Sequence, residues 1–338
     1  DVYKRQEDIE HIRQIADRER APFYVVGETT GDHRFVFEQT DGVKPIDLAM
    51  EDMFGKAPRT VMTDRTVEET YEDVTYDQTQ LDEYVERVLQ LEAVACKDWL
   101  TNKVDRSVTG KIARQQCQGE IQLPLSDCGV VALDYRGRAG IATSIGHAPQ
   151  AALVDPAAGS VLSIAEALTN IVWAPLSEGL DSVSLSANWM WPCKNEGEDA
   201  RLYRAVEACS DFACSLRINI PTGKDSLSMT QKYGKDKVYS PGTVIISAGA
   251  EVSDIRKVVS PVLRTGVNST IYYIDFSFDK LKLGGSAFAQ SLDKIGKEVP
   301  TVQDSEYFAN AFNAVQELIN KELILAGHDI SAGGMITT

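Results

Sequence analysis

The chain has 338 residues, of which 43% are hydrophobic and 25% charged, as in an ordinary soluble globular protein. A formal net charge of −16 argues against a nucleic-acid groove, which needs a basic stripe, and favours a soluble cytoplasmic protein. No run of 18 apolar residues and no basic-then-apolar leader is present, so neither a membrane span nor secretion is predicted. The length leaves room for two or three domains.

Cysteine and histidine usage gives no nucleophile. The six cysteines form no CxxC pair and have no His-rich companion, so buried thiols are predicted rather than a zinc site. None lies in the context expected of an amidotransferase nucleophile. His147 and His328 each lie beside a glycine without a visible triad partner, so we assign no catalytic residue.

The first part of the chain predicts a small α+β region followed by a connector. Helices are expected over Ile9–Ala21 and Ile46–Phe54, and short apolar runs occur at Phe23–Val26 and Phe35–Phe37. Residues 66–95 are acidic and then become helical. Their apolar side chains at helical spacing are Leu81, Val85, Val88 and Leu89.

Residues 113–252 hold the densest pattern of apolar runs. Helices are expected over Ser160–Trp173, which is strongly apolar, and Glu198–Leu216, which is amphipathic. The expected strands are Pro124–Leu133, Leu153–Asp155, Val183–Asn188 and Val244–Ala248.

Strands and helices continue to mix after residue 252. Strands are expected over Ile271–Phe276 and Leu323–Asp329, and helices over Ser286–Ile295 and Tyr307–Ile319. Because no regular strand–helix–strand period runs along the chain, the pattern favours an α+β fold over a doubly wound one. The first helix starts abruptly and the last residues predict only the first turn of a helix, so we expect an internal piece of a longer protein.

Several oxygen-bearing side chains are candidates for a metal and phosphate site. Glu166 and Asn170 share one helix face, and a carboxylate with an amide carbonyl suits a hard cation such as Mg²⁺. Asp127 lies in an apolar run, where a carboxylate needs a cation or several N–H donors. Asp329 and Ser331 precede two glycines, an arrangement that can hold phosphate and metal. The structural alternatives are a Glu–Asn hydrogen bond, a satisfied buried carboxyl and a simple corner.

A second candidate phosphate contact lies further along the chain. Gly223, Lys224 and Ser226 combine a glycine, a cation and a hydroxyl. The leading glycine of a Walker A loop is missing, so a P-loop is not predicted. A polar turn between strands is the structural alternative.

Seven motifs together resemble one known family. They are Gln115–Gly119, Ala142–His147, Glu166–Asn170, Leu185–Met190, Gly197–Asp199, Pro221–Ser226 and Gly327–Ser331. In this order they resemble the phosphoribosylformylglycinamidine synthase family, the large ATP- and glutamine-dependent ligases of purine biosynthesis. The resemblance covers residues 20–338, and its most specific parts are Leu-Ser-Ala-Asn-Trp-Met and Gly-Lys-Asp-Ser.

The resemblance implies a fold and a domain order. In that family the synthetase region is an internal duplication, and each half has an N-type and a C-type domain similar to aminoimidazole ribonucleotide synthetase. The implied parts are the end of a first C-type domain (1–77), a connector helix (78–112), a second N-type domain (113–252) and a truncated second C-type domain (253–338).

The resemblance also implies cofactors, ATP or ADP with Mg²⁺, and the residues that hold them. The family's metal ligands match Asp127, Glu166, Asn170 and Asp329, and its nucleotide contacts match Ser126 and Ser331. Relatives carry Ala where this chain has Ser126, so a backbone contact is expected there. Smaller relatives read Gly-Asn-Val-Ser at Gly223–Ser226, and Lys224 departs from that pattern, which places a metal role there in doubt.

The implied reaction converts formylglycinamide ribonucleotide, glutamine and ATP to formylglycinamidine ribonucleotide, glutamate, ADP and phosphate. ATP phosphorylates the substrate amide, and ammonia from a separate glutaminase domain displaces the phosphate. The implied partners are the substrate and that glutaminase domain, with neither nucleic acid nor membrane. The alternatives are a non-catalytic half that holds a structural Mg-nucleotide, and a related ATP-using enzyme such as aminoimidazole ribonucleotide synthetase.

Overall fold

Residues 6–56, 59, 61–101, 103, 106 and 110–338 are described by the computed structural model. They divide into two units, Asp1–Val61 and Met62–Thr338. Among these residues no helix is long and apolar enough to cross a membrane.

The described part of the first unit holds short elements with little burial. The 3-10 turn η1 (Gln6–Asp8) leads into α1 (Ile9–Arg18), β1 (Arg34–Phe37) pairs antiparallel with β2 (Ile46–Ala49), and α2 (Met50–Phe54) follows. The helix expected over Ile46–Phe54 is wrong in its first half, because Ile46 pairs with Phe37 across the hairpin. The run Phe23–Val26 forms no strand.

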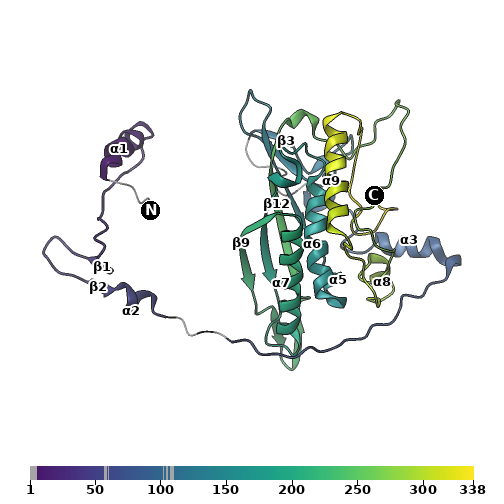
Figure 1. Ribbon diagram of the computed structural model, residues 1–338, viewed down its shortest axis with the longest axis horizontal. Coiled ribbons are helices and arrows are strands. Elements are labelled where there is room, and N and C mark those ends of the chain that lie inside the picture. Colours follow the sequence, from purple (N-terminus) through teal and green to yellow (C-terminus); the bar gives the residue numbers. More distant parts are fainter. Residues whose placement is uncertain (1–5, 57–58, 60, 102, 104–105, 107–109) are drawn as a thin grey trace. The chain divides into compact units, whose positions relative to one another are not determined.

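A six-stranded mixed sheet organises the second unit (Figure 1). Its order is β3 (Ile112–Arg114), β6 (Gly129–Ala132), β7 (Gly140–Gly146), β12 (Thr243–Val252), β8 (Ser184–Met190) and β9 (Asn219–Ser226). Neighbouring strands are antiparallel except β8 and β9, which are parallel. Along β7 buried and exposed residues alternate strictly, so one face of this strand is covered and the other is open.

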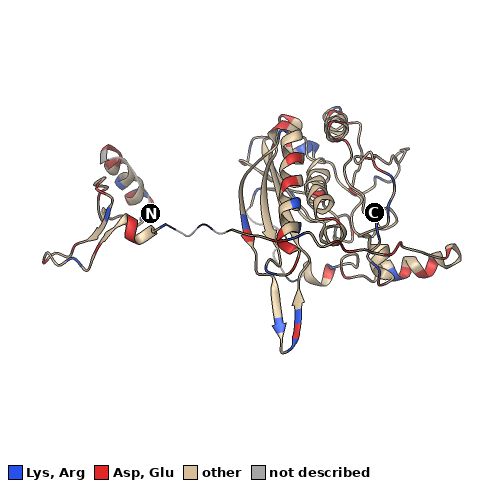
Figure 2. Ribbon diagram, turned by 60° about the horizontal axis from the view of Figure 1, so that its bottom comes forward, with Lys and Arg blue, Asp and Glu red and all other residues tan. Residues whose placement is uncertain are grey.

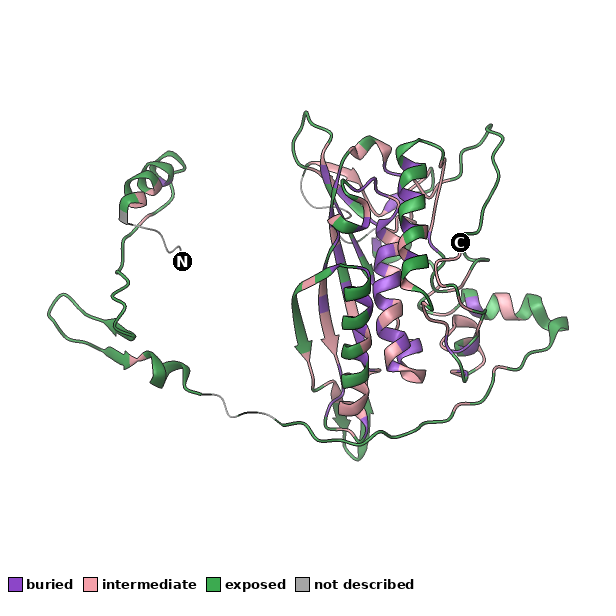
Figure 3. Ribbon diagram, viewed as in Figure 1, coloured by how far each residue is buried: buried purple, intermediate pink, exposed green. Residues whose placement is uncertain are grey.

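Helices cover one face of the sheet. The longest are α6 (Pro156–Ile171), α7 (Glu198–Ser215) and α9 (Ser305–Asn320), and the buried positions of α6 face the sheet and α7 (Figures 1 and 3). The core joins all three helices, since Phe212 of α7 and Phe308 of α9 meet edge to face at 5.7 Å. Arginines are interspersed with Asp and Glu along α7 (Figure 2).

Shorter elements complete the second unit. They are η2 (Gln78–Gln80), α3 (Leu81–Leu89), α4 (Asp98–Thr101), the pair β4 (Cys117–Gln118) and β5 (Leu123–Pro124), α5 (Pro149–Val154), η3 (Gly179–Ser182), the hairpin β10 (Thr230–Tyr233) and β11 (Asp236–Tyr239), η4 (Ile255–Lys257) and α8 (Ala287–Ser291).

Most expected elements of this unit are present, and the α+β class is confirmed. Four predictions are wrong in part or whole. The strand expected over Pro124–Leu133 is split into β5 and β6. The strand expected over Leu153–Asp155 is instead the end of α5 and the N-cap of α6. The Asp155 carboxylate caps α6 by accepting from the N–H of Ala157 at 2.9 Å. Ile271–Phe276 and Leu323–Asp329 form no strand, because no described strand pairs with them. The domain boundaries expected at 77, 112 and 252 stay predictions.

Candidate functional site

The strand order gathers three candidate ligands at one end of the sheet. Because β6 runs antiparallel to β7 with Gly129 opposite Thr143, Asp127 extends past the start of β6 toward the level of Ile145. Asn170 on α6 reaches the same level, and its Nδ2 donates to the carbonyl oxygen of Ile145 at 2.9 Å. Glu166 lies one turn earlier on α6 and so shares this face.

Close packing of β7 on α6 fixes the Glu166 carboxylate. A Cβ at Gly146 would lie 2.2 Å from the Ser163 carbonyl oxygen and 2.3 Å from the Ala167 nitrogen, so a glycine is needed there. The approach brings the N–H of His147 to 2.7 Å from Oε2 of Glu166. A strand end and a helix therefore hold this side chain between them.

Asp127, His328 and Asp329 form a cluster across a long sequence separation. Nδ1 of His328 lies 3.2 Å from Oδ1 of Asp127 and 3.5 Å from Oδ1 of Asp329. The N–H of Asp329 donates to Oδ2 of Asp127 at 3.0 Å. One ligand atom from each of the three lies within 4.8 Å of the others, which is close enough to share a cation.

The same segment also reaches Glu166. Ser331 donates its hydroxyl to Oε1 of Glu166 at 2.8 Å. Gly327, at the start of the segment, packs on Trp173, since a Cβ there would lie 2.1 Å from the indole ring. Residues 327–331 thus connect the two carboxylates of the sheet end, Asp127 and Glu166.

The charges of the cluster are out of balance without a cation. Burial and the nearby Asp329 carboxylate raise the pKa of Asp127 to about 7. The hydrogen bond to Asp329 raises the pKa of His328 to about 9, despite burial. Burial also raises the pKa of Glu166, although the N–H of His147 and the hydroxyl of Ser331 oppose this effect. The His328 imidazolium lies between the two aspartates and offsets part of their charge.

The structure brings together five of the predicted site residues and separates three. Asp127, Glu166, Asn170, Asp329 and Ser331 lie at one end of the sheet. Ser126 is adjacent, with its hydroxyl oxygen buried and without a hydrogen-bond partner among the described residues. His328 was not among the predicted ligands.

Gly223, Lys224 and Ser226 lie in strand β9 and not in a turn, so the loop reading of this segment is wrong. Gly223 pairs with Ala187, Ala187 with Ile246, and Ile246 with Gly146. Gly223 in β9 is therefore three strand spacings, about 14 Å, from Gly146 in β7. The Lys224 ammonium contacts the Ser226 hydroxyl instead of the carboxylate cluster.

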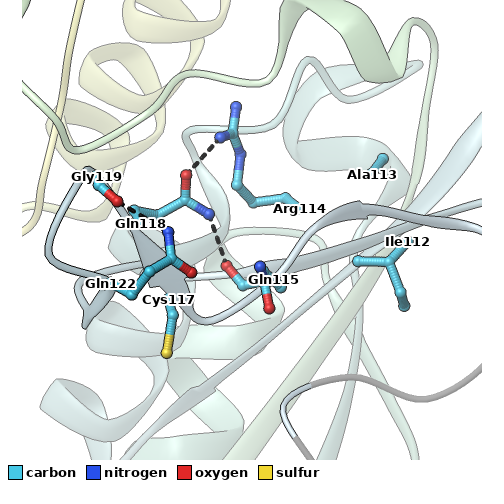
Figure 4. A pocket seen from close by; sticks show the side chains of 8 residues that line it. All are labelled: Ile112, Ala113, Arg114, Gln115, Cys117, Gln118, Gly119 and Gln122. Carbon is cyan, nitrogen blue, oxygen red and sulfur yellow. Dashed lines mark hydrogen bonds between the residues drawn. The ribbon is translucent and has the colours of Figure 1, made fainter. Parts of the chain in front are cut away.

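A polar pocket of about 420 Å³ lies beside the cluster, along β3 and β4 (Figure 4). Within it Nη1 of Arg114 donates to Oε1 of Gln118 at 2.8 Å, and Nε2 of Gln118 donates to the carbonyl oxygen of Gln115 at 3.0 Å. This motif, Gln115–Gly119, is thus used to hold the Arg114 guanidinium in one orientation.

Comparison with known proteins identifies relatives of this chain. A family model described as the FGAR-AT PurM_N-like domain matches residues 96–251. The phosphoribosylformylglycinamidine synthase of Drosophila melanogaster is 38% identical over 346 residues, covering 97% of this chain and 25% of that protein. The Homo sapiens protein of the same name is 37% identical over 344 residues, covering 96% of this chain and 26% of its own length.

Two solved structures share the fold. They are Thermotoga maritima PurL complexed with AMPPCP, with a TM-score of 0.51, and the same protein complexed with ATP, with a TM-score of 0.50. Both are 14% identical, and they cover 77% of this chain and 39% and 38% of theirs. The sheet and its helices therefore define a domain of the PurM-like synthetase class. The chain belongs to the phosphoribosylformylglycinamidine synthase family and spans about a quarter of the length of the curated relatives it matches.

Proposed function

We propose that the chain is part of an ATP-dependent carbon–nitrogen ligase of de novo purine biosynthesis. The proposed reaction converts formylglycinamide ribonucleotide, glutamine and ATP to formylglycinamidine ribonucleotide, glutamate, ADP and phosphate. The observation that carries this proposal is that Asp127 and Glu166 both contact residues 327–331, which include Asp329. The names of the relatives support the reaction, and the ATP and AMPPCP complexes of the fold neighbour support a nucleotide ligand.

Asp127, Glu166, Asn170 and Asp329 are the proposed Mg²⁺ ligands. Like charges 4 Å apart cost roughly 4 kcal/mol at an effective dielectric of 20, so gathered carboxylates need a cation. The donor set fits Mg²⁺, which prefers oxygen, because three carboxylates and the Asn170 carbonyl oxygen supply it. When bound, Mg²⁺ would neutralise the charge of nucleotide phosphates. His328 holds the two aspartates together until then.

The nucleotide contacts are proposed on both sides of this metal site. Ser331 is exposed, so its hydroxyl can turn from Glu166 to a phosphate oxygen. Ser126 would contribute its backbone. Gly223, Lys224 and Ser226 would contact a separate phosphate, because their strand lies three places along the sheet from β7.

The second candidate function is to bind a nucleotide that stabilises the fold and takes no part in catalysis. It is favoured by the way the site joins residues 202 positions apart, since a ligand there would hold distant segments together. The exchange of bound ADP for labelled ADP separates the two. Exchange as fast as turnover in the full-length enzyme supports a catalytic site, and much slower exchange supports a structural one.

Glu166→Ala tests the metal-nucleotide site. Mg-ADP at a hundredfold excess over its Kd stabilises the folded chain by about 2.7 kcal/mol, which raises the melting temperature by several degrees. The Glu166→Ala chain should show no such rise, whereas Glu207→Ala, on the exposed side of α7, should respond like the wild type. An equal rise in all three chains would refute the proposed site.

Lys224→Ala tests the separate phosphate contact. Lys224 is exposed, so its loss should change the unfolding free energy by no more than about 0.5 kcal/mol. In the full-length enzyme the KM or kcat should change, measured against Lys232→Ala on the β10–β11 hairpin. Normal kinetics together with a lower melting temperature would contradict a phosphate role.

A further inference from the structure

Three buried polar atoms beside Asp127 lack a hydrogen-bond partner among the described residues. They are Nε of Arg114, Oγ of Ser126 and Nε1 of Trp173. Buried polar groups are nearly always hydrogen-bonded, to protein or to ordered water. Nε1 of Trp173 faces the Asp127 carboxylate and acts to lower its pKa, but the two do not meet hydrogen-bond geometry. The three atoms around this carboxylate therefore indicate a shared partner that is not a side chain.

All three residues line one small cavity. Its volume is about 10 Å³, and its wall includes Asp127 together with Gly327. This volume matches the space that a single water molecule needs. Gly327 sets the size of the cavity, because a Cβ there would displace the Trp173 ring.

The two hydrogen bonds made by Arg114 leave its Nε–H available to the cavity. Its Nη1 donates to Oε1 of Gln118 at 2.8 Å (Figure 4), and its Nη2 donates to the carbonyl oxygen of Val258 at 2.9 Å. A guanidinium is planar, so these two bonds also fix the direction of the Nε–H bond. Arg114 thus separates the large polar pocket from the small cavity.

We propose that this cavity is a binding site for one ordered water molecule. The water accepts hydrogen bonds from Nε of Arg114 and Nε1 of Trp173, and donates to the Asp127 carboxylate and to Oγ of Ser126. Four polar groups are the number that a water can satisfy. A cation is disfavoured by the two N–H donors, and an anion by the Asp127 carboxylate.

The water gives Asp127 a second point of attachment. On one side the carboxylate accepts from the N–H of Asp329 and faces His328. The water links its other side to β3 through Arg114 and to the end of α6 through Trp173. It is therefore a positioning element for Asp127, and its presence does not depend on whether a nucleotide binds.

A double-mutant cycle tests the water in the purified chain. Ser126→Ala removes one of its partners with little change in shape, whereas Trp173→Phe removes another and also leaves space in the packing against Gly327. The two losses in urea midpoint should be non-additive, because both act through one water. In a dry cavity Ser126→Ala removes an unsatisfied polar atom, so its midpoint would rise and the two changes would add. Trp189→Phe, whose indole nitrogen is not among the unpartnered atoms, is the control.

A crystal structure of the wild-type chain gives an independent answer that does not depend on how stable the variants are. The expected result is one water within 2.7–3.2 Å of at least three of the four groups. Empty density in the cavity, or an Arg114 or Trp173 that has moved to pair with another protein group, would overturn the proposal.

Discussion

Buried carboxylates in this chain behave in opposite ways according to what surrounds them. Asp127 faces another carboxylate, and its pKa rises to about 7. The Asp279 side chain is also largely covered but lies nearer the surface than Asp127, and Lys282 donates to it at 2.8 Å and the N–H of Lys280 at 2.7 Å. Burial acts to raise the pKa of Asp279, and these donors outweigh it and lower the pKa to about 2. The first arrangement calls for a ligand, and the second stabilises the fold.

The Asp279 contacts predict an acid-sensitive contribution to stability. A carboxyl whose pKa is lowered by folding stabilises the native state above its unfolded pKa of about 4, and this contribution is lost as the pH falls toward the folded value of about 2. Asp279→Asn should lower the urea midpoint at pH 7 and flatten its dependence on pH between 4 and 2. Asp236→Asn, in the exposed β10–β11 hairpin, is the control. A pH dependence that Asp279→Asn leaves unchanged would contradict the assignment.

The candidate ligands could be chosen from the sequence because their residue types and spacing carry chemistry. Glu166 and Asn170 share a helix face by spacing alone, and the structure keeps them there. Their meeting with Asp127 and residues 327–331 was predicted with the help of the family resemblance, because periodicity alone carries no information on tertiary packing. His328 was missed for the same reason, because a histidine beside a glycine gives no signal until two carboxylates are known to flank it. Whether these residues bind a metal and a nucleotide stays a prediction.

At the scale of elements, the contact between β7 and α6 determines where Glu166 lies. Gly146→Ala should force the two apart, because its Cβ has no space between backbone atoms of α6. Overpacking of this kind costs about 1–3 kcal/mol. Gly249→Ala is the matched control in the same sheet, since its Cβ would meet only one backbone oxygen at 4.0 Å. Urea unfolding should separate the two variants, and equal midpoints would show that β7 and α6 are not held so tightly.

The pattern of residues predicted helices better than strands, for physical reasons. Glu198–Ser215 and Ser305–Asn320 were found because amphipathic spacing extends over several turns. Leu153–Asp155 was predicted as a strand because so short a run shows no helical spacing. Pro149 and Pro156, which begin α5 and α6, were the better signal for helices there. The run Ile271–Phe276 has strand composition, but a strand also needs a neighbour to take its hydrogen bonds.

On the scale of the whole second unit, α9 belongs to the core of the sheet. Gln316 of α9 is buried, and its side chain bonds the carbonyl oxygens of Val172 and Ala174 and the N–H of Leu176. Phe308 and Phe312 are fully covered in the same core. The region after residue 252 is thus tied to the strands before it. The sequence predicts an apolar face on this helix but not which strands it covers, and a buried glutamine gives no signal until its partners are known.

This attachment predicts that α9 and the sheet unfold together. Phe312→Ala should lower the unfolding free energy by about 3–5 kcal/mol, as expected for a phenylalanine removed from a packed core. Leu318→Ala changes a partly exposed residue of the same helix and should cost much less. Amide hydrogen exchange should give α9 and β12 the same opening free energy. A lower value for α9 alone would show that it opens independently.

The long sequence separation within the site has a consequence for synthesis on the ribosome. Asp127 and Glu166 emerge first, and their partners Asp329 and Ser331 follow 202 and 165 residues later. Until then the nascent chain carries Asp127 without the N–H of Asp329, and Glu166 with the N–H of His147 but without the hydroxyl of Ser331. Any ligand that needs the complete cluster is therefore excluded from early cotranslational folding. Retention of a stalled nascent chain on an immobilised ligand of the site would begin only once residue 331 has left the exit tunnel.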